Sequence, residues 1–281
     1  MTDFLQAVFT YSFLQFALLG GVLASIACGV VGTWVVARRI TYIAGGIAHT
    51  VLGGLGLAHW IRVTWDVSWL HPVYGAVVAA IVSAIIIGFV SLKARHREDT
   101  VIGALWAVGM AVGIICIAAT PGYNQDLMTY LFGNILFLSP SDIVMILLLD
   151  VIVVGTGMYL YNQFTAVCFD QEYARVRGLN VDVLYIALLC LTALTVVILT
   201  TIVGIILVIA LLTLPVATVS PFCKTLKRTM LWSIVISSFC ILIGIAVSYS
   251  PNLPAGASII LVCGAFYFGS LLLSRYSTAA R

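Results

Sequence analysis

Charge is what this sequence has least of. Only 8% of its 281 residues are Asp, Glu, Lys or Arg, and 63% are hydrophobic, whereas a water-soluble domain carries about 25% charged residues. Apolar runs recur along the chain, each long enough to cross a hydrocarbon layer of ~30 Å. The sequence has none of the ~10-residue alternating segments of a membrane β-barrel. These features exclude a soluble globule and predict an all-α polytopic membrane protein.

Several motifs that supply chemistry or energy are also missing. The chain contains no GxxxxGK[ST] loop, so we do not expect it to hydrolyse ATP. Its seven cysteines are scattered without a CxxC pair, which argues against a disulfide framework or a cysteine metal site. It also lacks the dense intramembrane acidic and histidine residues of an ion-coupled carrier. We therefore expect a protein that is not an enzyme, binds no cofactor of its own and depends on another subunit for energy; no nucleic-acid partner is expected.

The apolar segments predict nine transmembrane helices in a single domain over residues 1–281. The charge-free stretch 183–219 is too long for one span at 1.5 Å per residue, so we expect two helices that meet near 200–204. Eight spans remain possible if this stretch or the first span is irregular. The expected spans cover 13–36, 42–61, 72–92, 100–120, 141–161, two within 183–219, 230–249 and 257–273.

Basic residues predict how these spans are oriented. With nine spans, twelve of the 13 Lys and Arg residues fall on one side, and only Arg62 falls on the other. Basic loops are typical of the cytoplasmic side. We therefore expect a bacterial inner-membrane protein with its N-terminus outside and its C-terminus in the cytoplasm. The twelve are Arg38, Arg39, Lys93, Arg95, Arg97, Arg175, Arg177, Lys224, Lys227, Arg228, Arg275 and Arg281.

One polar segment, 169–178, stands between the spans on this cytoplasmic side. Asp170 is a favourable N-cap and Glu172 lies in the first turn, where the helix dipole favours an acid. Arg175 lies in the last turn, and Gly178 suits the left-handed position that ends a helix. The pattern predicts a short amphipathic helix exposed to the cytoplasm. An ordinary polar loop with a turn of helix is the alternative interpretation.

This segment resembles a known signature. Glu172-x-Ala174-x-x-x-Gly178 resembles the coupling loop of ABC importer permeases, and FDQEYARVRGLNV (169–181) is similar to that loop in the metal-type family, which carries zinc, manganese or iron. Three further stretches resemble the same family in the same order and extend the similarity over most of the chain. They are RRITYIAGGIAHTVLGGLGLA (38–58), VGIILVIALLTLPVATV (203–219) and NLPAGASIILV (252–262).

The resemblance implies a permease that works as a dimer of two copies or with a paralogue. Two cytoplasmic ATPase subunits would hydrolyse ATP, and an extracytoplasmic binding protein would deliver a divalent metal, with zinc first and manganese or iron as alternatives. The helix at 169–178 would seat in a groove on each ATPase, with Tyr173 and Ala174 packed inside. The residues implied in coupling are Asp170, Glu172, Tyr173, Ala174, Arg175 and Gly178.

The second span holds the first candidate for the metal pathway. Gly45, His49 and Gly53 are spaced i, i+4, i+8 and share a helix face; small residues there let helices approach closely. The family has a pathway residue at the position of His49, whereas a packed, hydrogen-bonded histidine is the alternative. Many relatives have Asp where this chain has Gly45. Imidazole without a carboxylate favours zinc over manganese.

Two other residues of the spans stand out. Asp150 lies near the middle of its span, where a charge costs about 2.5–3.5 kcal/mol, so we expect it to face the bundle interior or the pathway. Pro215 predicts a kink that serves either gating or packing. Asp142, after Ser139, is expected to be an N-cap. A metal-chelate permease and a stand-alone carrier or channel remain alternatives; uptake without any ATPase would favour the last.

Overall fold

The computed structural model describes residues 2–93, 97–121, 133, 135–249 and 253–279. Within them, nine helices are long and apolar enough to cross a membrane, and no strand occurs. This confirms the all-α prediction and favours nine spans over eight. The nine are α2 (Ser12–Ala37), α3 (Thr41–Thr64), α4 (Pro72–Lys93), α5 (Glu98–Ala119), α7 (Pro140–Tyr159), α10 (Val181–Val203), α11 (Ile205–Val219, continued by η3, Ser220–Phe222), α12 (Leu226–Tyr249) and α13 (Ala255–Ala279).

The long uncharged stretch divides where the sequence predicted. Gly204 ends α10 with φ 91° and ψ 156°, and its N–H donates to the Thr200 carbonyl at 3.1 Å. This backbone conformation is open to glycine but strained for other residues. A single residue therefore separates α10 from α11.

Short helices add detail that hydropathy did not predict. They are α1 (Thr2–Thr10), η2 (Ile135–Phe137), α8 (Tyr161–Phe169) and α9 (Gln171–Val176). At the start of α7 the prediction for Asp142 was wrong, because Ser139 is the N-cap. The Asp142 carboxylate instead accepts from the Ser139 backbone N–H at 2.9 Å, which completes a capping box.

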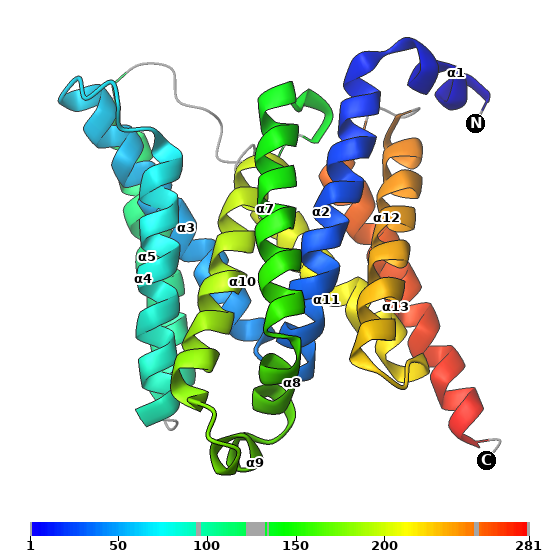
Figure 1. The fold of residues 1–281 in the computed structure, drawn as a ribbon. Coiled ribbons are helices and arrows are strands. Elements are labelled where there is room, and N and C mark those ends of the chain that lie inside the picture. The colour runs from blue at the N-terminus through cyan, green and yellow to red at the C-terminus, as the bar shows by residue number, and fades with distance from the viewer. Residues whose placement is uncertain (1, 94–96, 122–132, 134, 250–252, 280–281) are drawn as a thin grey trace.

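The helices pack in two neighbourhoods that share α10 (Figure 1). In one, α3 packs against α4 and α5; in the other, α2 packs against α7 and α12. Glycines bring α3 and α5 together: a Cβ at Gly53 would lie 2.6 Å from the Gly109 carbonyl oxygen, and one at Gly56 would lie 2.7 Å from that of Gly113. The small residues of the second span therefore serve close helix packing.

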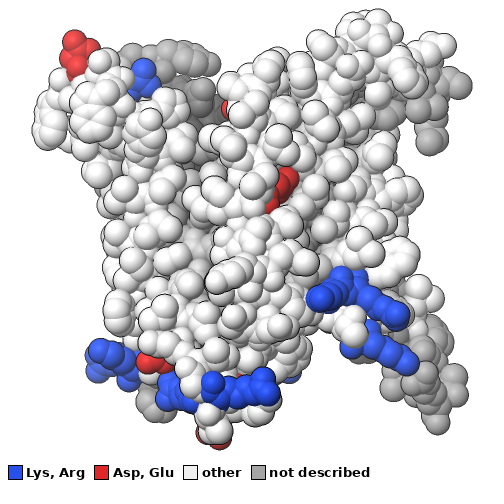
Figure 2. All heavy atoms as spheres, in the orientation of Figure 1, with Lys and Arg blue, Asp and Glu red and all other residues white. Residues whose placement is uncertain are grey.

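Basic residues are segregated to the ends of the bundle. Figure 2 shows Lys and Arg side chains gathered at the end where α9 lies. Arg62, in the last turn of α3, belongs to the other end. The side chains of Arg95, Arg275 and Arg281 lie outside the described part of the chain. The described basic residues thus follow the one-sided distribution that the sequence predicted.

Candidate coupling surface and metal pathway

Helix α9 has only six residues, and its shape depends on both of its caps. The Asp170 Oδ1 accepts from the Tyr173 N–H at 2.9 Å, so Asp170 is the N-cap. At the other end Gly178 has φ 78°; its N–H donates to the Arg175 carbonyl at 2.9 Å, and the Leu179 N–H donates to the Ala174 carbonyl at 3.1 Å. This hydrogen-bond pair is a Schellman motif. Both predicted caps are present in the structure, and they satisfy backbone groups that a six-residue helix leaves unpaired.

The two faces of α9 differ in exposure. Ala174 is fully buried, whereas Val176 is 88% exposed and Tyr173 is 51% exposed. The expectation that the Ala174 methyl packs into a partner is therefore wrong, because this side chain packs within its own chain, where α9 meets α8 and α10. Phe169, just before the N-cap, is also exposed. Tyr173 and Val176 form the exposed apolar tip of α9.

Two arginines make contacts at α9, one with α10 and one within the helix itself. Arg175 donates to the Asp182 carboxylate at 3.0 Å, which links α9 to the first turn of α10. Both side chains are more than half exposed, so this ion pair contributes at most about 1 kcal/mol. The Arg177 guanidinium lies 5.3 Å from the centroid of the Tyr173 ring. Of the predicted coupling residues, Glu172 is exposed and forms no ion pair within the described ranges.

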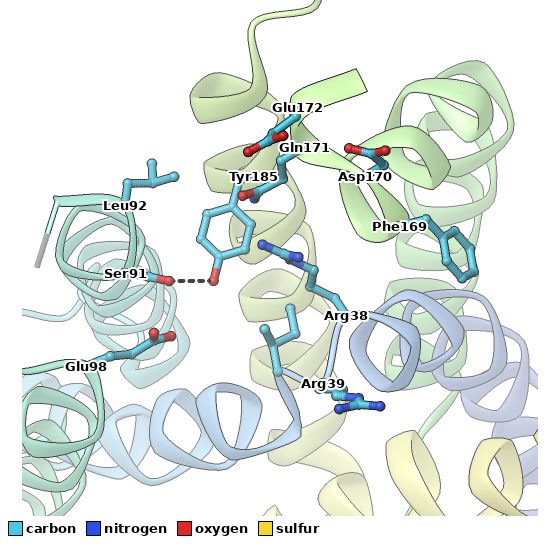
Figure 3. Close-up of a pocket in the computed structure, with 11 residues that line it drawn as sticks. Arg38, Arg39, Ser91, Leu92, Glu98, Phe169, Asp170, Gln171, Glu172 and Tyr185 are labelled. Carbon is cyan, nitrogen blue, oxygen red and sulfur yellow. Dashed lines mark hydrogen bonds between the residues drawn. The ribbon is translucent and has the colours of Figure 1, made fainter. Parts of the chain in front are cut away.

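A cavity of about 460 Å³ lies behind residues 169–178, the segment predicted to couple to an ATPase and called the coupling segment below (Figure 3). It brings the turn between α2 and α3 next to the start of α9. On one wall the buried Tyr185 shares a hydrogen bond of 3.1 Å with Ser91, and the Arg38 guanidinium lies 5.7 Å from the Tyr185 ring centroid. The lining residues are Arg38, Arg39, Ile40, Ser91, Leu92, Glu98, Phe169, Asp170, Gln171, Glu172 and Tyr185.

In the sequence, Arg38 belongs to the cytoplasmic basic residues and to the family-like stretch 38–58, but neither feature predicted this cavity. Its walls come from four separate parts of the chain, and no local spacing links them. Arg38 follows α2 directly, Ser91 lies in the last turn of α4, and Tyr185 lies in the second turn of α10. The cavity therefore connects the coupling segment with the turn that leads into α3, the helix that carries His49.

His49 lies buried on α3 and stacks on Trp106 of α5. The ring centroids are 4.2 Å apart and the planes differ by 10°. The His49 Nδ1 has no hydrogen-bond partner in the described chain. The predicted alternative of a hydrogen-bonded core histidine therefore does not hold for this nitrogen. Trp106 was not singled out from the sequence, because its contact with His49 depends on how α3 and α5 are aligned.

The two glycines flanking His49 have different surroundings. A Cβ at Gly45 would lie 3.9 Å from the Trp106 Cζ3, an ordinary van der Waals contact, whereas Gly53 has no room for one. A side chain is thus sterically possible at position 45. Pro215 lies buried within α11, which continues to Val219; the kink predicted there stays a prediction.

Asp150 lies on α7, in the second neighbourhood. Its carboxylate is buried beside Ala27 and Cys28 of α2. His49 packs against α5, so the two predicted pathway residues lie in different helix contacts. Within the described ranges, no group of three or more His, Cys, Asp or Glu side chains is arranged to hold a metal ion.

Comparison with known proteins decides the family. The model of the ABC 3 transport family matches residues 10–274, almost the whole chain. The chain belongs to the ABC 3 transport family. This family member is therefore a membrane permease subunit of an ABC transporter of the metal type, not an enzyme, as the resemblance implied.

Relatives of this ABC 3 permease match it from end to end. It is 38% identical over 264 residues to a probable metal transport system membrane protein of Chlamydia trachomatis, covering 94% of this chain and 90% of the relative. It is 34% identical over 272 residues to the manganese transport system membrane protein MntC of Listeria monocytogenes, covering 96% and 94%.

Solved structures agree with this assignment. PsaBC from Streptococcus pneumoniae, in complex with Fab, matches with a TM-score of 0.87 and 28% identity, covering 100% of this chain and 99% of the other. A putative metal-chelate type ABC transporter matches with a TM-score of 0.71 at 12% identity, which is a similarity of fold alone. The ABC 3 permease therefore has the fold that the sequence predicted.

Proposed function

We propose that this permease carries a divalent transition-metal ion into the cytoplasm and is driven by ATP hydrolysis on a separate ATPase subunit. The observation that supports this most is the capped helix α9, whose tip carries exposed Tyr173 and Val176 at the basic end of the bundle. Basic ends face the cytoplasm, so the N-terminus is outside and the C-terminus inside. Residues 1–281 act as one permease domain, paired with a second copy or a paralogue, and an extracytoplasmic binding protein delivers the metal.

In this proposal the apolar tip of α9 docks into a groove on the ATPase. Asp170 and Gly178 hold the helix in shape, Tyr173 contacts the partner, and Ala174 anchors α9 to its own bundle. Glu172 is free for a polar contact at the groove, and Arg175 ties α9 to α10. ATP-driven closure of the ATPase pair moves α9 and biases the permease between outward-open and inward-open states.

The contacts around the cavity provide a route from α9 to the spans. Displacement of α9 acts directly on α10 through the Arg175–Asp182 pair. Tyr185 of α10 contacts both Ser91 of α4 and Arg38 at the turn before α3. Movement at the ATPase is thereby transmitted to the helix that bears His49.

For the metal, manganese is the first candidate, because the MntC relative, aligned over 96% of this chain, is named for manganese transport. The zinc preference expected from the sequence becomes the second candidate, supported by an imidazole at His49 without a carboxylate at Gly45. His49 is the leading pathway residue and Asp150 the second. Gly45, Gly53 and Pro215 serve packing and gating. One imidazole binds a divalent ion weakly, as transport requires.

Metal uptake into proteoliposomes tests this function. The vesicles contain the permease, the ATPase and the binding protein, and uptake of Mn²⁺ and Zn²⁺ is compared with and without ATP. We expect ATP-dependent Mn²⁺ uptake that falls about tenfold in His49→Ala, the lower end of losses at metal sites. His71→Ala, an exposed histidine outside the spans, is the matched control. Uptake that persists without the ATPase would instead indicate a stand-alone carrier or channel.

A further inference from the structure

The contact between His49 and Trp106 involves a face of the imidazole ring and not its edge. The rings stack face to face, with centroids 4.2 Å apart and planes 10° from parallel. Imidazole binds metal ions through its nitrogens, which point outward in the plane of the ring. A stacked indole therefore occupies one face of the ring without covering the nitrogens. It restricts rotation of the side chain while metal binding at the edge stays possible.

A metal-binding histidine is normally oriented by a hydrogen bond to its other nitrogen. The His49 Nδ1 has no such partner within the described residues, although the side chain is buried. An unpaired buried polar group is costly and requires an explanation. Stacking on Trp106 supplies the orientation that a hydrogen bond supplies elsewhere, and it leaves the nitrogen unoccupied.

Three residues on one side of α3 lie next to the Trp106 indole. Tyr42 lies 6.1 Å from Trp106 between ring centroids, and a Cβ at Gly45 would lie 3.9 Å from the Trp106 Cζ3. Tyr42, Gly45 and His49 are spaced i, i+3, i+7 and so follow one side of α3. The indole of Trp106 therefore lies along this side of α3, beside both Tyr42 and His49.

We propose that Trp106 is a positioning residue for metal transport. Its indole lies against Gly45 and fixes the His49 imidazole so that the nitrogen edge of that ring meets the passing ion. This inference rests on the proposed function, and in particular on His49 as a pathway residue.

A comparison of Trp106→Phe and Trp106→Leu in the reconstituted complex tests the proposal. Phe keeps an aromatic face for the imidazole, whereas Leu keeps only apolar volume. We expect Trp106→Leu to lower ATP-dependent Mn²⁺ uptake about fivefold, the factor associated with one stacked aromatic pair, and Trp106→Phe to retain most of it. Basal ATPase activity and assembly of the complex stay unchanged. Trp232→Leu, at an exposed position on α12, is the matched control and keeps full uptake.

The same Trp106 substitutions in the His49→Ala variant distinguish a role of Trp106 in positioning His49 from a role in helix packing alone. If Trp106 acts through His49, Trp106→Leu has no further effect on the residual uptake of His49→Ala. An equal fold loss in both backgrounds would overturn the proposal, as would wild-type uptake in Trp106→Leu or an equal loss in the Phe and Leu variants. Should His49→Ala leave no measurable uptake, the Phe and Leu comparison decides alone. Failure of the wild-type complex to take up metal with ATP would refute the proposed function instead.

Discussion

Replacing Gly178 by alanine tests the coupling segment through its backbone alone. Gly178 has φ 78°, and a Cβ placed there would meet nothing within 4 Å. The substitution therefore removes no contact and creates no clash. What it adds is the cost of holding an L-residue in the left-handed conformation, about 1–2 kcal/mol.

That cost falls on a helix with little stability of its own. A helix of six residues does not form without its surroundings, and both hydrogen bonds of the Schellman motif depend on the left-handed residue. A cost of about 1–2 kcal/mol shifts the balance between the capped and uncapped forms by roughly 5- to 30-fold. Asp170→Ala, which removes the N-cap, costs about 1 kcal/mol and acts in the same direction.

The assay is ATP-dependent metal uptake together with ATP hydrolysis in the reconstituted complex. We expect Gly178→Ala to lower uptake about fivefold or more, while basal ATP hydrolysis and insertion of the permease remain normal. Gly155→Ala is the matched control, since Gly155 lies within α7, has equally open surroundings and lacks a positive φ. Asp170→Asn keeps the capping oxygen and is expected to retain uptake. Wild-type uptake in Gly178→Ala would refute the argument that the capped shape of α9 transmits the movement.

Three further substitutions test the spans. Gly45→Asp adds a carboxylate one turn from His49, at a position with room for a side chain. In competition assays we expect this substitution to raise the ratio of Mn²⁺ to Zn²⁺ uptake about threefold or more, because carboxylate suits manganese. An unchanged ratio would contradict the placement of position 45 beside the pathway. Gly53→Ala places a methyl 2.6 Å from the Gly109 carbonyl oxygen, so α3 and α5 must separate. We expect the free energy of unfolding to fall by about 1–3 kcal/mol, measured as a lower midpoint of thermal denaturation in detergent, whereas the midpoint of Gly155→Ala should not fall. Asp150→Asn removes a buried charge that costs about 2.5–3.5 kcal/mol within the membrane, so we expect the thermal stability to be equal or higher and metal uptake to be reduced. Uptake at the wild-type level would exclude Asp150 from the pathway.

The features that the sequence predicted correctly depend on residues that are close to one another along the chain. Each span needs about 20 apolar residues whatever packs around it, so the boundaries of the spans followed from hydropathy. The caps of α9 are equally local, since Asp170 bonds an N–H three residues away and Gly178 bonds within one turn. The division at Gly204 followed from the length of the uncharged stretch. At the start of α7, where both Ser139 and Asp142 can serve as the N-cap, the prediction from the sequence named the wrong residue.

Other features depend on contacts between helices that the sequence keeps far apart. Whether Ala174 faces a partner or its own bundle is decided by how α9 lies against α8 and α10. Trp106 and His49 are 57 positions apart along the chain, and their rings stack only at a particular alignment of α3 with α5. The cavity behind the coupling segment needs four parts of the chain at once. Hydropathy predicts how deep a residue of a span lies in the membrane, but it does not predict the rotation of the helix that carries the residue.

The sequence by itself therefore determined the class of protein, the approximate bounds of the spans, the gathering of basic residues at one end and the caps of α9, because hydropathy, charge and capping act within one segment. Only the tertiary structure decided which side chains meet: His49 with Trp106, Asp150 with α2, and Arg38 with Tyr185. These pairings follow from close packing of helices through glycines such as Gly53, where the rotation and alignment of each helix depend on the shapes of its neighbours.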